Sequence, residues 1–338
     1  MSRDDRTAAQ VPAAAAGRTG RVLHAGQAVV DVVLRIPAVP DPGGDVFASS
    51  HDLVAGGGVN TMTAAARDGA QVVYLGSHGT GPFGDLVRSA LSDEGVHVLA
   101  EPAPAQDTGF SVALVDDSAE RTFISTSGAE ACTPLPQLLA GTPVPGDVLC
   151  VSGYSLAHPV NRESLLEWLP SLADGIRVVV DPSPVIGDVD LEAVHVLLRR
   201  ADVWSTNERE ARLLLGRLDA DPSTAASELE SLARNLSTRI GKVVVLRAGA
   251  HGALLARPDG TVLPLPAPEV TAVDTNGAGD AHTGVLCAQL AAGASLESAV
   301  RRAGVAAAIA VTRRGPATAP TADETDHMLD RLYGASSS

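Results

Sequence analysis

The residues best suited to chemistry lie in segment 273–285, where an apolar run leads through Gly277 and Gly279 into a second apolar run. Both glycines can adopt backbone conformations that other residues disfavour, so several N–H groups at a helix N-terminus can point at one position. Such a position attracts anions. Asp280 follows in the first helical turn and would place a proton acceptor beside that anion. An anion site next to a base is the arrangement that transfers a phosphoryl group to a hydroxyl group.

A purely structural interpretation of these residues is also open. Asn276-Gly277 is a common tight-turn pair, and an acid such as Asp280 in the first helical turn often only complements the helix dipole. The complete string Asp-Thr-Asn-Gly-Ala-Gly-Asp, residues 274–280, favours the chemical interpretation. It resembles the signature of the ribokinase-like (phosphofructokinase B type) carbohydrate kinases, and the resemblance extends over about residues 21–320.

The resemblance implies a role for each residue of this string. Asp280 matches the family's general base. Gly277, Ala278 and Gly279 match the anion hole for the transferring phosphoryl group, and Thr275 belongs to the nucleotide site. ATP and Mg²⁺ are the cofactors that follow from this assignment.

The string Asn207-Glu208-Arg209-Glu210 resembles the family's Asn-x-x-Glu motif, in which the Glu helps to organise magnesium and phosphate. By this resemblance Glu210 acts on magnesium through water, which suits the reluctance of Mg²⁺ to lose its hydration shell. The alternative is an ordinary Asn cap with a capping-box acid three residues later, and the local sequence fits it equally well.

Residues 247–252, Arg-Ala-Gly-Ala-His-Gly, follow an apolar run and resemble the family's nucleotide loop, with Arg247, Gly249 and Gly252 near the phosphates. Arg247 stands where relatives often carry Thr or Lys. Its guanidinium could contact a phosphate through two parallel hydrogen bonds. A plain β-turn remains the structural alternative.

Asp31 and Gly56-Gly57-Gly58-Val59-Asn60 resemble the family's amino-terminal sugar site, where a carboxylate and an amide bind adjacent hydroxyls. The alternatives are a solvated strand residue for Asp31 and a helix cap for Asn60. Gly57 departs from the Gly-Gly-Lys-Gly-Ala-Asn form of ribokinases, and residues 181–184 lack the Asn and Arg of the Asp-x-Asn-x-Arg form. We expect ribose or a similar monosaccharide as the acceptor, with a nucleoside as the alternative because adenosine kinases share the 274–280 string.

Two further features have weaker signals. The turn at residues 310–315 resembles one that binds a monovalent cation such as K⁺ in many relatives, which would place Asp274 and Gly315 at that ion. His282 replaces the family's usual Phe two residues after the base. Because residues i and i+2 of a helix do not share a face, we do not expect His282 to be catalytic.

Other functions fit parts of the sequence. Residues 79–84 fit GxGxxG, and Glu101 lies near the spacing of a ribose-binding acid, so an NAD-dependent dehydrogenase is an alternative. Pro82 argues against it because it removes an N–H from the phosphate-facing turn. A non-catalytic sugar sensor is a further alternative, which the intact Asp280 disfavours. The only lysine, Lys242, precedes Val243, which excludes a Walker A loop.

Composition narrows the partners to small molecules. The 338 residues carry a formal net charge of −15 and only 3% aromatics, so neither nucleic acid nor an anionic membrane is expected as a partner. Three scattered cysteines and the lack of an apolar run of ~18 residues suggest a cytoplasmic protein without membrane spans. Residues 1–20 lack a signal-peptide apolar region and are expected to form a disordered tail.

Strand-like and helix-like segments alternate from residue 146 onward, which predicts a parallel sheet with helices on both faces. We therefore expect a three-layer α/β sandwich with a mostly parallel central sheet, plus a small β-sheet lid. The α/β domain would comprise residues 21–27, 56–107 and 128–334, and the lid residues 28–55 and 108–127. A thin lid cannot bury apolar residues on both faces, so a homodimer is expected, as in ribokinases.

Overall fold

The computed structural model describes residues 19–118, 121–218 and 228–334. The disordered tail expected over residues 1–20 lies outside this part of the chain, apart from its last two residues. The sequence also predicts a helix over 223–239, and its start lies outside the described residues as well. No described helix has the length and apolar character needed to cross a membrane.

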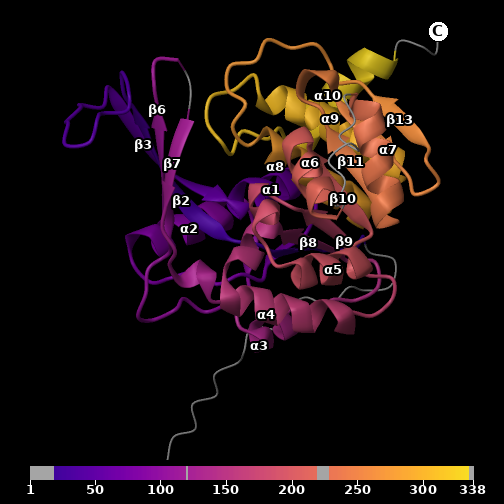
Figure 1. Ribbon diagram of the computed structural model, residues 1–338, viewed down its shortest axis with the longest axis horizontal. Coiled ribbons are helices and arrows are strands. Elements are labelled where there is room, and N and C mark those ends of the chain that lie inside the picture. Colours follow the sequence, from indigo (N-terminus) through magenta and orange to yellow (C-terminus); the bar gives the residue numbers. More distant parts are fainter. Residues whose placement is uncertain (1–18, 119–120, 219–227, 335–338) are drawn as a thin grey trace, which may run out of the picture.

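The larger sheet has nine strands in the order β13-β12-β11-β10-β9-β8-β1-β4-β5. Strands β8 to β11 and β13 are labelled in Figure 1. Its strands are β1 Val22–Ala25, β4 Val72–Tyr74, β5 His97–Val98, β8 Val148–Ser152, β9 Arg177–Asp181, β10 Val203–Asn207, β11 Val243–Arg247, β12 Ala253–Ala256 and β13 Val262–Leu265. Pairing is parallel from β11 to β5 and antiparallel from β11 to β13. The sequence predicts this antiparallel edge from two short apolar runs, residues 253–257 and 261–266.

Helices cover both faces of this sheet. One apolar core joins the sheet to α1 Gly58–Arg67, α2 Pro82–Asp93, α8 Ala278–Ala291 and α9 Leu296–Ala310, with α10 Ala322–Tyr333 packed on α9. A second core lies on the opposite face under α3 Leu135–Ala140, α4 Pro159–Trp168, α5 Leu191–Arg200, α6 Glu208–Leu218 and α7 Leu229–Ile240. Successive strand residues serve the two cores alternately: Val22 faces the first and Leu23 the second. The predicted three-layer α/β fold is confirmed.

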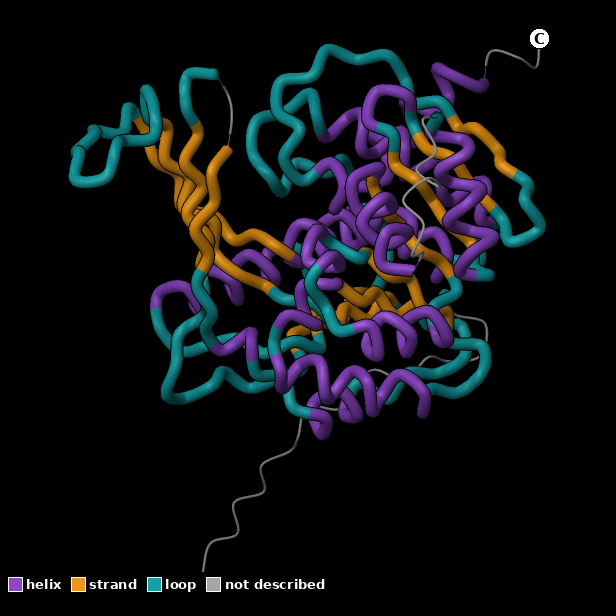
Figure 2. Tube along the Cα trace, viewed as in Figure 1, coloured by secondary structure: helices purple, strands orange, loops and turns teal. Residues whose placement is uncertain are grey.

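The smaller sheet, which we call the lid, projects from the body (Figure 2). Its strands are β2 Ala28–Arg35, β3 Ser50–Gly57, β6 Phe110–Val115 and β7 Arg121–Ser125, in the order β3-β2-β6-β7. β2 pairs antiparallel with β3 and parallel with β6. β6 and β7 pair as an antiparallel hairpin, which the sequence predicts from its strand-like runs 109–115 and 121–127.

Some elements differ from the sequence-based expectation. The weak alternation of residues 45–54 predicts a strand there, but the strand begins at Ser50 and continues through Gly57, because Gly56 and Gly57 pair with β2 despite the weak strand preference of glycine. β5 and α3 were not predicted. A two-residue strand has too few positions to show alternation, and the six-residue α3 has too few for a helical period.

Candidate active site

The candidate site lies at the carboxyl ends of the parallel strands, where open α/β sheets bind ligands. β8 and β9 end side by side at Ser152 and Asp181, which are paired in register. β10 and β11 end likewise at Asn207 and Arg247. Asp181 and Arg247 are 66 positions apart in the chain, and the parallel order of β9, β10 and β11 brings both to one edge of the sheet.

α8 begins at this edge through a turn that requires glycine. Gly277 is its N-cap in the left-handed conformation, with φ 75°. A Cβ on Gly277 would lie 2.1 Å from the carbonyl oxygen of Pro316, so no larger residue fits without moving the backbone. The glycine thus serves both the turn and the close approach of the 311–318 segment.

Asp280 lies in the first turn of α8 and contacts two residues of α1. The Thr61 hydroxyl donates to its Oδ1 at 3.0 Å, and Asn60 Nδ2 donates to its Oδ2 at 3.3 Å. Burial, with a smaller contribution from Asp181, raises the pKa of Asp280 to about 6, although the two hydrogen bonds oppose the shift. A carboxylate with this pKa is an effective proton acceptor near neutral pH.

Arg247 occupies the centre of a buried polar network. Its NH1 donates to Asp181 Oδ2 at 2.8 Å, Thr283 Oγ1 at 2.7 Å and Ser205 Oγ at 3.0 Å, and its NH2 lies 3.4 Å from Glu210 Oε2. Burial lowers the pKa of Arg247, but Asp181 and Glu210 outweigh it and the net shift is upward. The guanidinium also lies against Gly279, because a Cβ there would be 3.6 Å from Arg247 Cζ. Arg247 therefore links both carboxylates to the first turn of α8, and its contact with a phosphate stays a prediction.

Asn207 and Glu210 bond to each other at the start of α6. Asn207 donates its backbone N–H to Glu210 Oε2 at 3.0 Å and its Nδ2 to Oε1 at 2.8 Å, and its Oδ1 accepts the Glu210 N–H at 2.9 Å. These are the hydrogen bonds of a helix cap. Both carboxylate oxygens of Glu210 are thus engaged by protein donors, and Oε2 also lies 3.4 Å from Arg247 NH2.

The predicted sugar residues form one continuous group that reaches Asp280. A Cβ on Gly56 would lie 2.0 Å from Asp31 Oδ2, so the carboxylate rests directly against this glycine. Burial raises the pKa of Asp31 to about 6. Gly57, with φ 59°, is the N-cap of α1, and Gly58 begins that helix. Asn60 is buried, donates to Asp280, and has no hydrogen-bond partner for Oδ1 among the described residues.

The other predicted residues lie around this centre. Gly249 and Gly252, with φ 57° and 88°, shape the turn after β11, and Thr275 is exposed in the loop before α8. Asp274 Oδ2 accepts the Gly315 N–H at 3.2 Å, so these two residues are in contact. His282 is buried in α8. Burial lowers its pKa to about 3, so the ring is neutral at physiological pH.

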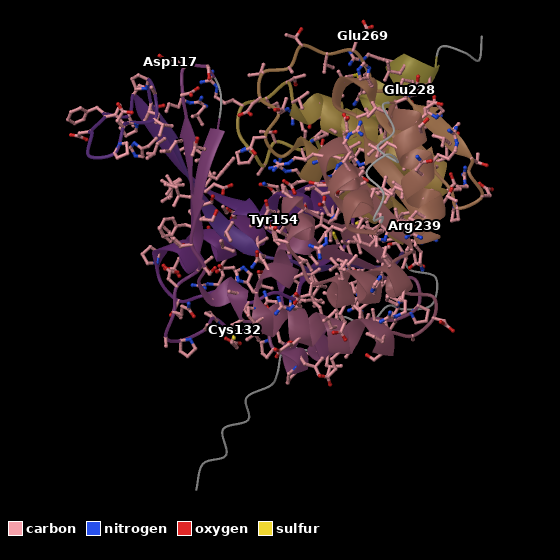
Figure 3. All side chains as sticks on the ribbon, viewed as in Figure 1. Asp117, Cys132, Tyr154, Glu228, Arg239 and Glu269 are labelled. Atoms are coloured by element: carbon pink, nitrogen blue, oxygen red, sulfur yellow. The ribbon has the colours of Figure 1, made fainter. Side chains whose placement is uncertain are left out.

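Several residues of the site were not predicted. Thr61, Ser205 and Thr283 all bond to Asp280 or Arg247, and Asp181 was noted only for its departure from a family motif. Tyr154, which follows β8 and is labelled in Figure 3, is 47% exposed. The pKa of Tyr154 is raised by burial, then by Glu210, Asp181 and Asp280, which indicates its proximity to the centre. The ends of parallel strands could have drawn attention to Asp181 and Tyr154.

The GxGxxG segment does not form a dinucleotide site. Gly81 is the N-cap of α2, but the carboxylate of Asp107 accepts the N–H groups of Phe83 at 3.1 Å and Gly84 at 2.7 Å. The amides that would bind a pyrophosphate are therefore used by the protein itself.

Comparison with known proteins agrees with this geometry. A family model described as pfkB family carbohydrate kinase matches residues 25–323. The chain is 32% identical to the uncharacterized sugar kinase YegV of Escherichia coli (strain K12), covering 90% of this chain and 92% of that protein. It is 27% identical to the ribokinase of Haemophilus influenzae, covering 89% and 95%. The structure of Arabidopsis thaliana ribokinase complexed with ribose and ATP superposes with a TM-score of 0.74 at 21% identity, covering 92% of this chain and 99% of that one.

The chain belongs to the pfkB family of carbohydrate kinases, which is the family that its 274–280 string resembles. It is more particularly a sugar kinase of the ribokinase type, an ATP-dependent phosphotransferase. This identification excludes the dehydrogenase and the non-catalytic sensor.

Proposed function

We propose that the protein transfers the γ-phosphoryl group of ATP to a hydroxyl of a small sugar, with a ribose-like monosaccharide as the first candidate. The observation that carries the proposal is Asp280, which combines a pKa near 6 with hydrogen bonds from α1 and a place next to the Gly277–Gly279 amides. Asp280 takes the proton of the reacting hydroxyl. The amides and Arg247 stabilise the negative charge on the transferring group.

The acceptor binds between Asp31 and Asn60 in this proposal. The carboxylate of Asp31 accepts from sugar hydroxyls, while the unpartnered Oδ1 of Asn60 accepts from a hydroxyl close to Asp280. Because Gly57 stands where ribokinases have a lysine, this loop offers the sugar no positively charged side chain. The enzyme holds its sugar by carboxylates and by uncharged hydrogen-bonding groups.

The chemistry of the donor set fits Mg²⁺. The pKa values of Glu210 and Asp280 are raised mainly by burial and secondly by Asp181, which shows that the three carboxylates lie close together. Such a cluster of oxygen donors favours a hard cation. Both Glu210 oxygens already accept protein hydrogen bonds, so Glu210 would hold the ion through water. No described group of three or more His, Cys, Asp or Glu forms a direct metal cage. The ion would neutralise phosphate charge.

A monovalent cation such as K⁺ is proposed at the contact between Asp274 and the 311–315 turn. Asp274 Oδ2 meets Gly315, and the carbonyl oxygen of Val311 accepts the Val273 and Asp274 N–H groups, so the segment closes over the loop before Gly277. An ion here would stabilise the anion hole. Turnover measured in K⁺ and in Na⁺ at equal ionic strength tests this role. Equal rates in the two salts would contradict a specific K⁺ site.

The experiment that tests the proposed function is a substrate panel. Purified protein with Mg²⁺ and ATP is offered pentoses, hexoses, keto-deoxy acids and nucleosides, and ADP release is measured with identification of the phosphorylated product. We expect one monosaccharide, ribose or a close relative, to give the highest kcat/KM. Selective phosphorylation of a nucleoside would show that the acceptor is a nucleoside and not a free sugar. If no compound of the panel is phosphorylated, the proposal is overturned.

A further inference from the structure

A cavity of about 1000 Å³ lies beside the candidate active site, between α6, α7, the 184–187 turn and the turn that follows β11. α6 and α7 are neighbours in the fold (Figure 1). The cavity shares Asn207, Arg247 and Gly249 with the proposed nucleotide site. Of the described residues that line it, none belongs to segment 274–280, so it is adjacent to the transfer centre and separate from it.

One face of α6 supplies most of the wall. Residues 209, 212, 213, 216 and 217 are spaced three to four apart and so share a helix face, and all of them line the cavity. A Cβ on Gly216 would have no neighbour within 4 Å, so the glycine leaves this wall recessed. Leu213 and Leu229 make part of the lining apolar.

The described residues of this lining are opposite in net charge to the whole protein. Among them the charged side chains are those of Arg209, Arg212, Arg217, Arg247 and Glu208, which is four cations against one anion, whereas the chain carries −15. Such a local reversal attracts small anions.

The arginines differ in how free they are to bind a ligand. Arg247 is committed to Asp181 and Glu210, Arg212 is paired with Glu208 at 2.8 Å, and Arg217 donates to the Gly187 carbonyl. The exposed Arg209 makes no hydrogen bond or ion pair within the described part of the chain. Arg209 can therefore bind an anion without breaking an existing contact, with the positive charges of Arg212 and Arg217 close by.

We propose that this cavity is a second anion site, which binds a small phosphate-bearing molecule while the nucleotide site is occupied. The arginines hold the phosphates by charge-assisted hydrogen bonds, and Leu213 and Leu229 contact the uncharged part of the ligand. Because the cavity shares Asn207 and Arg247 with the nucleotide site, its occupant couples to ATP affinity. The chemistry fits both the polyphosphate of a second nucleotide and a phosphorylated metabolite.

Calorimetry on the full-length protein tests the proposal. The nucleotide site is first saturated with a non-hydrolysable ATP analogue and Mg²⁺, and the protein is then titrated with tripolyphosphate or with fructose 1,6-bisphosphate. We expect one further site per chain. A preference for tripolyphosphate would indicate a second nucleotide, and a preference for the sugar bisphosphate a phosphorylated metabolite.

Matched variants identify the cavity as that site. Arg209→Ala should weaken binding about tenfold or more, as expected for the loss of a charge-assisted hydrogen bond, and Arg209→Lys should retain part of the affinity. Arg301→Ala removes an arginine of α9 outside the lining and should have no effect. Absence of binding to the analogue-loaded protein, or equal affinity in the wild type and Arg209→Ala, would overturn the proposal. Neither result depends on which sugar is phosphorylated.

Discussion

Asp280 is the residue on which the proposed chemistry depends most directly. Asp280→Asn retains its shape but removes the ionisable group, so we expect kcat to fall about 10²–10⁴-fold, the usual range for loss of a general base. ATP affinity should be retained or increase, because a carboxylate beside the phosphates is removed while the Gly277–Gly279 amides remain. Steady-state kinetics and calorimetry on both proteins measure these effects. A variant with nearly normal kcat would leave Asp280 only its role at the helix dipole.

The pH dependence of the reaction reports the same group. The base must be ionised, and its pKa is about 6, so kcat/KM for the sugar should rise as the pH increases through 6 and level off above it. The Thr61 hydroxyl stabilises the ionised form, and Thr61→Val should therefore move this limb to higher pH. An unchanged profile in Thr61→Val would show that the hydroxyl does not tune Asp280.

Residue identities could be predicted from the sequence where they belong to a contiguous motif. The strings around Asp280, Asn207 and Asn60 meet at one edge of the sheet. Asp181 and Thr61 were missed as site residues because their roles arise from contacts with Arg247 and Asp280, 66 and 219 positions away. Such long-range pairing leaves no local pattern.

At the scale of elements, the site depends on how closely α1 and α8 approach each other. A Cβ on Gly284 of α8 would lie 2.3 Å from the Thr61 carbonyl oxygen and 2.8 Å from Ala64 Cβ. This contact holds α1 at the distance that lets Asn60 and Thr61 reach Asp280. The sequence predicts a helix after the glycine-rich 55–60 loop and another after Gly277, but the separation of the two helices depends on Gly284, which has no visible role in the local pattern.

Gly284→Ala tests this helix contact. The added methyl group should separate α1 from α8, cost about 1–3 kcal/mol of unfolding free energy by overpacking, and lower kcat because the hydrogen bonds to Asp280 are disturbed. Gly304→Ala in α9 is the control, since its Cβ would meet nothing within 4 Å. That change should stabilise the protein by up to about 1 kcal/mol through helix propensity. The free energy of unfolding and kcat, measured for both variants, separate the steric effect at Gly284 from the general effect of replacing a helical glycine by alanine. Equal changes in the two variants would contradict the role of Gly284.

At the scale of the whole molecule, the described residues leave the outer part of one apolar face of the lid uncovered. Strand register places Ile124, Val112, Val32 and Leu53 in one row across the four strands, and Leu114 and Leu34 pair in the next row on the same face. Asp31 lies on the opposite face, paired with Ser111. Near the base of the lid, α2 covers the apolar face through Phe83 and Phe110, but Ile124 and Leu53 remain 59% and 49% exposed.

An exposed apolar sheet face of this kind is typical of a protein interface. We therefore predict a homodimer in which two lids pack by these faces, and light scattering at micromolar concentration should give twice the chain mass. Ile124→Lys should shift the equilibrium towards monomer because it places a charge in the apolar contact. Phe123→Lys is the matched control: Phe123 is also 59% exposed but, one residue along the same strand, points to the other face, so the dimer should persist. A wild-type protein of monomeric mass would show that the lid face stays open to solvent, and dissociation by both variants alike would place the interface elsewhere on the lid.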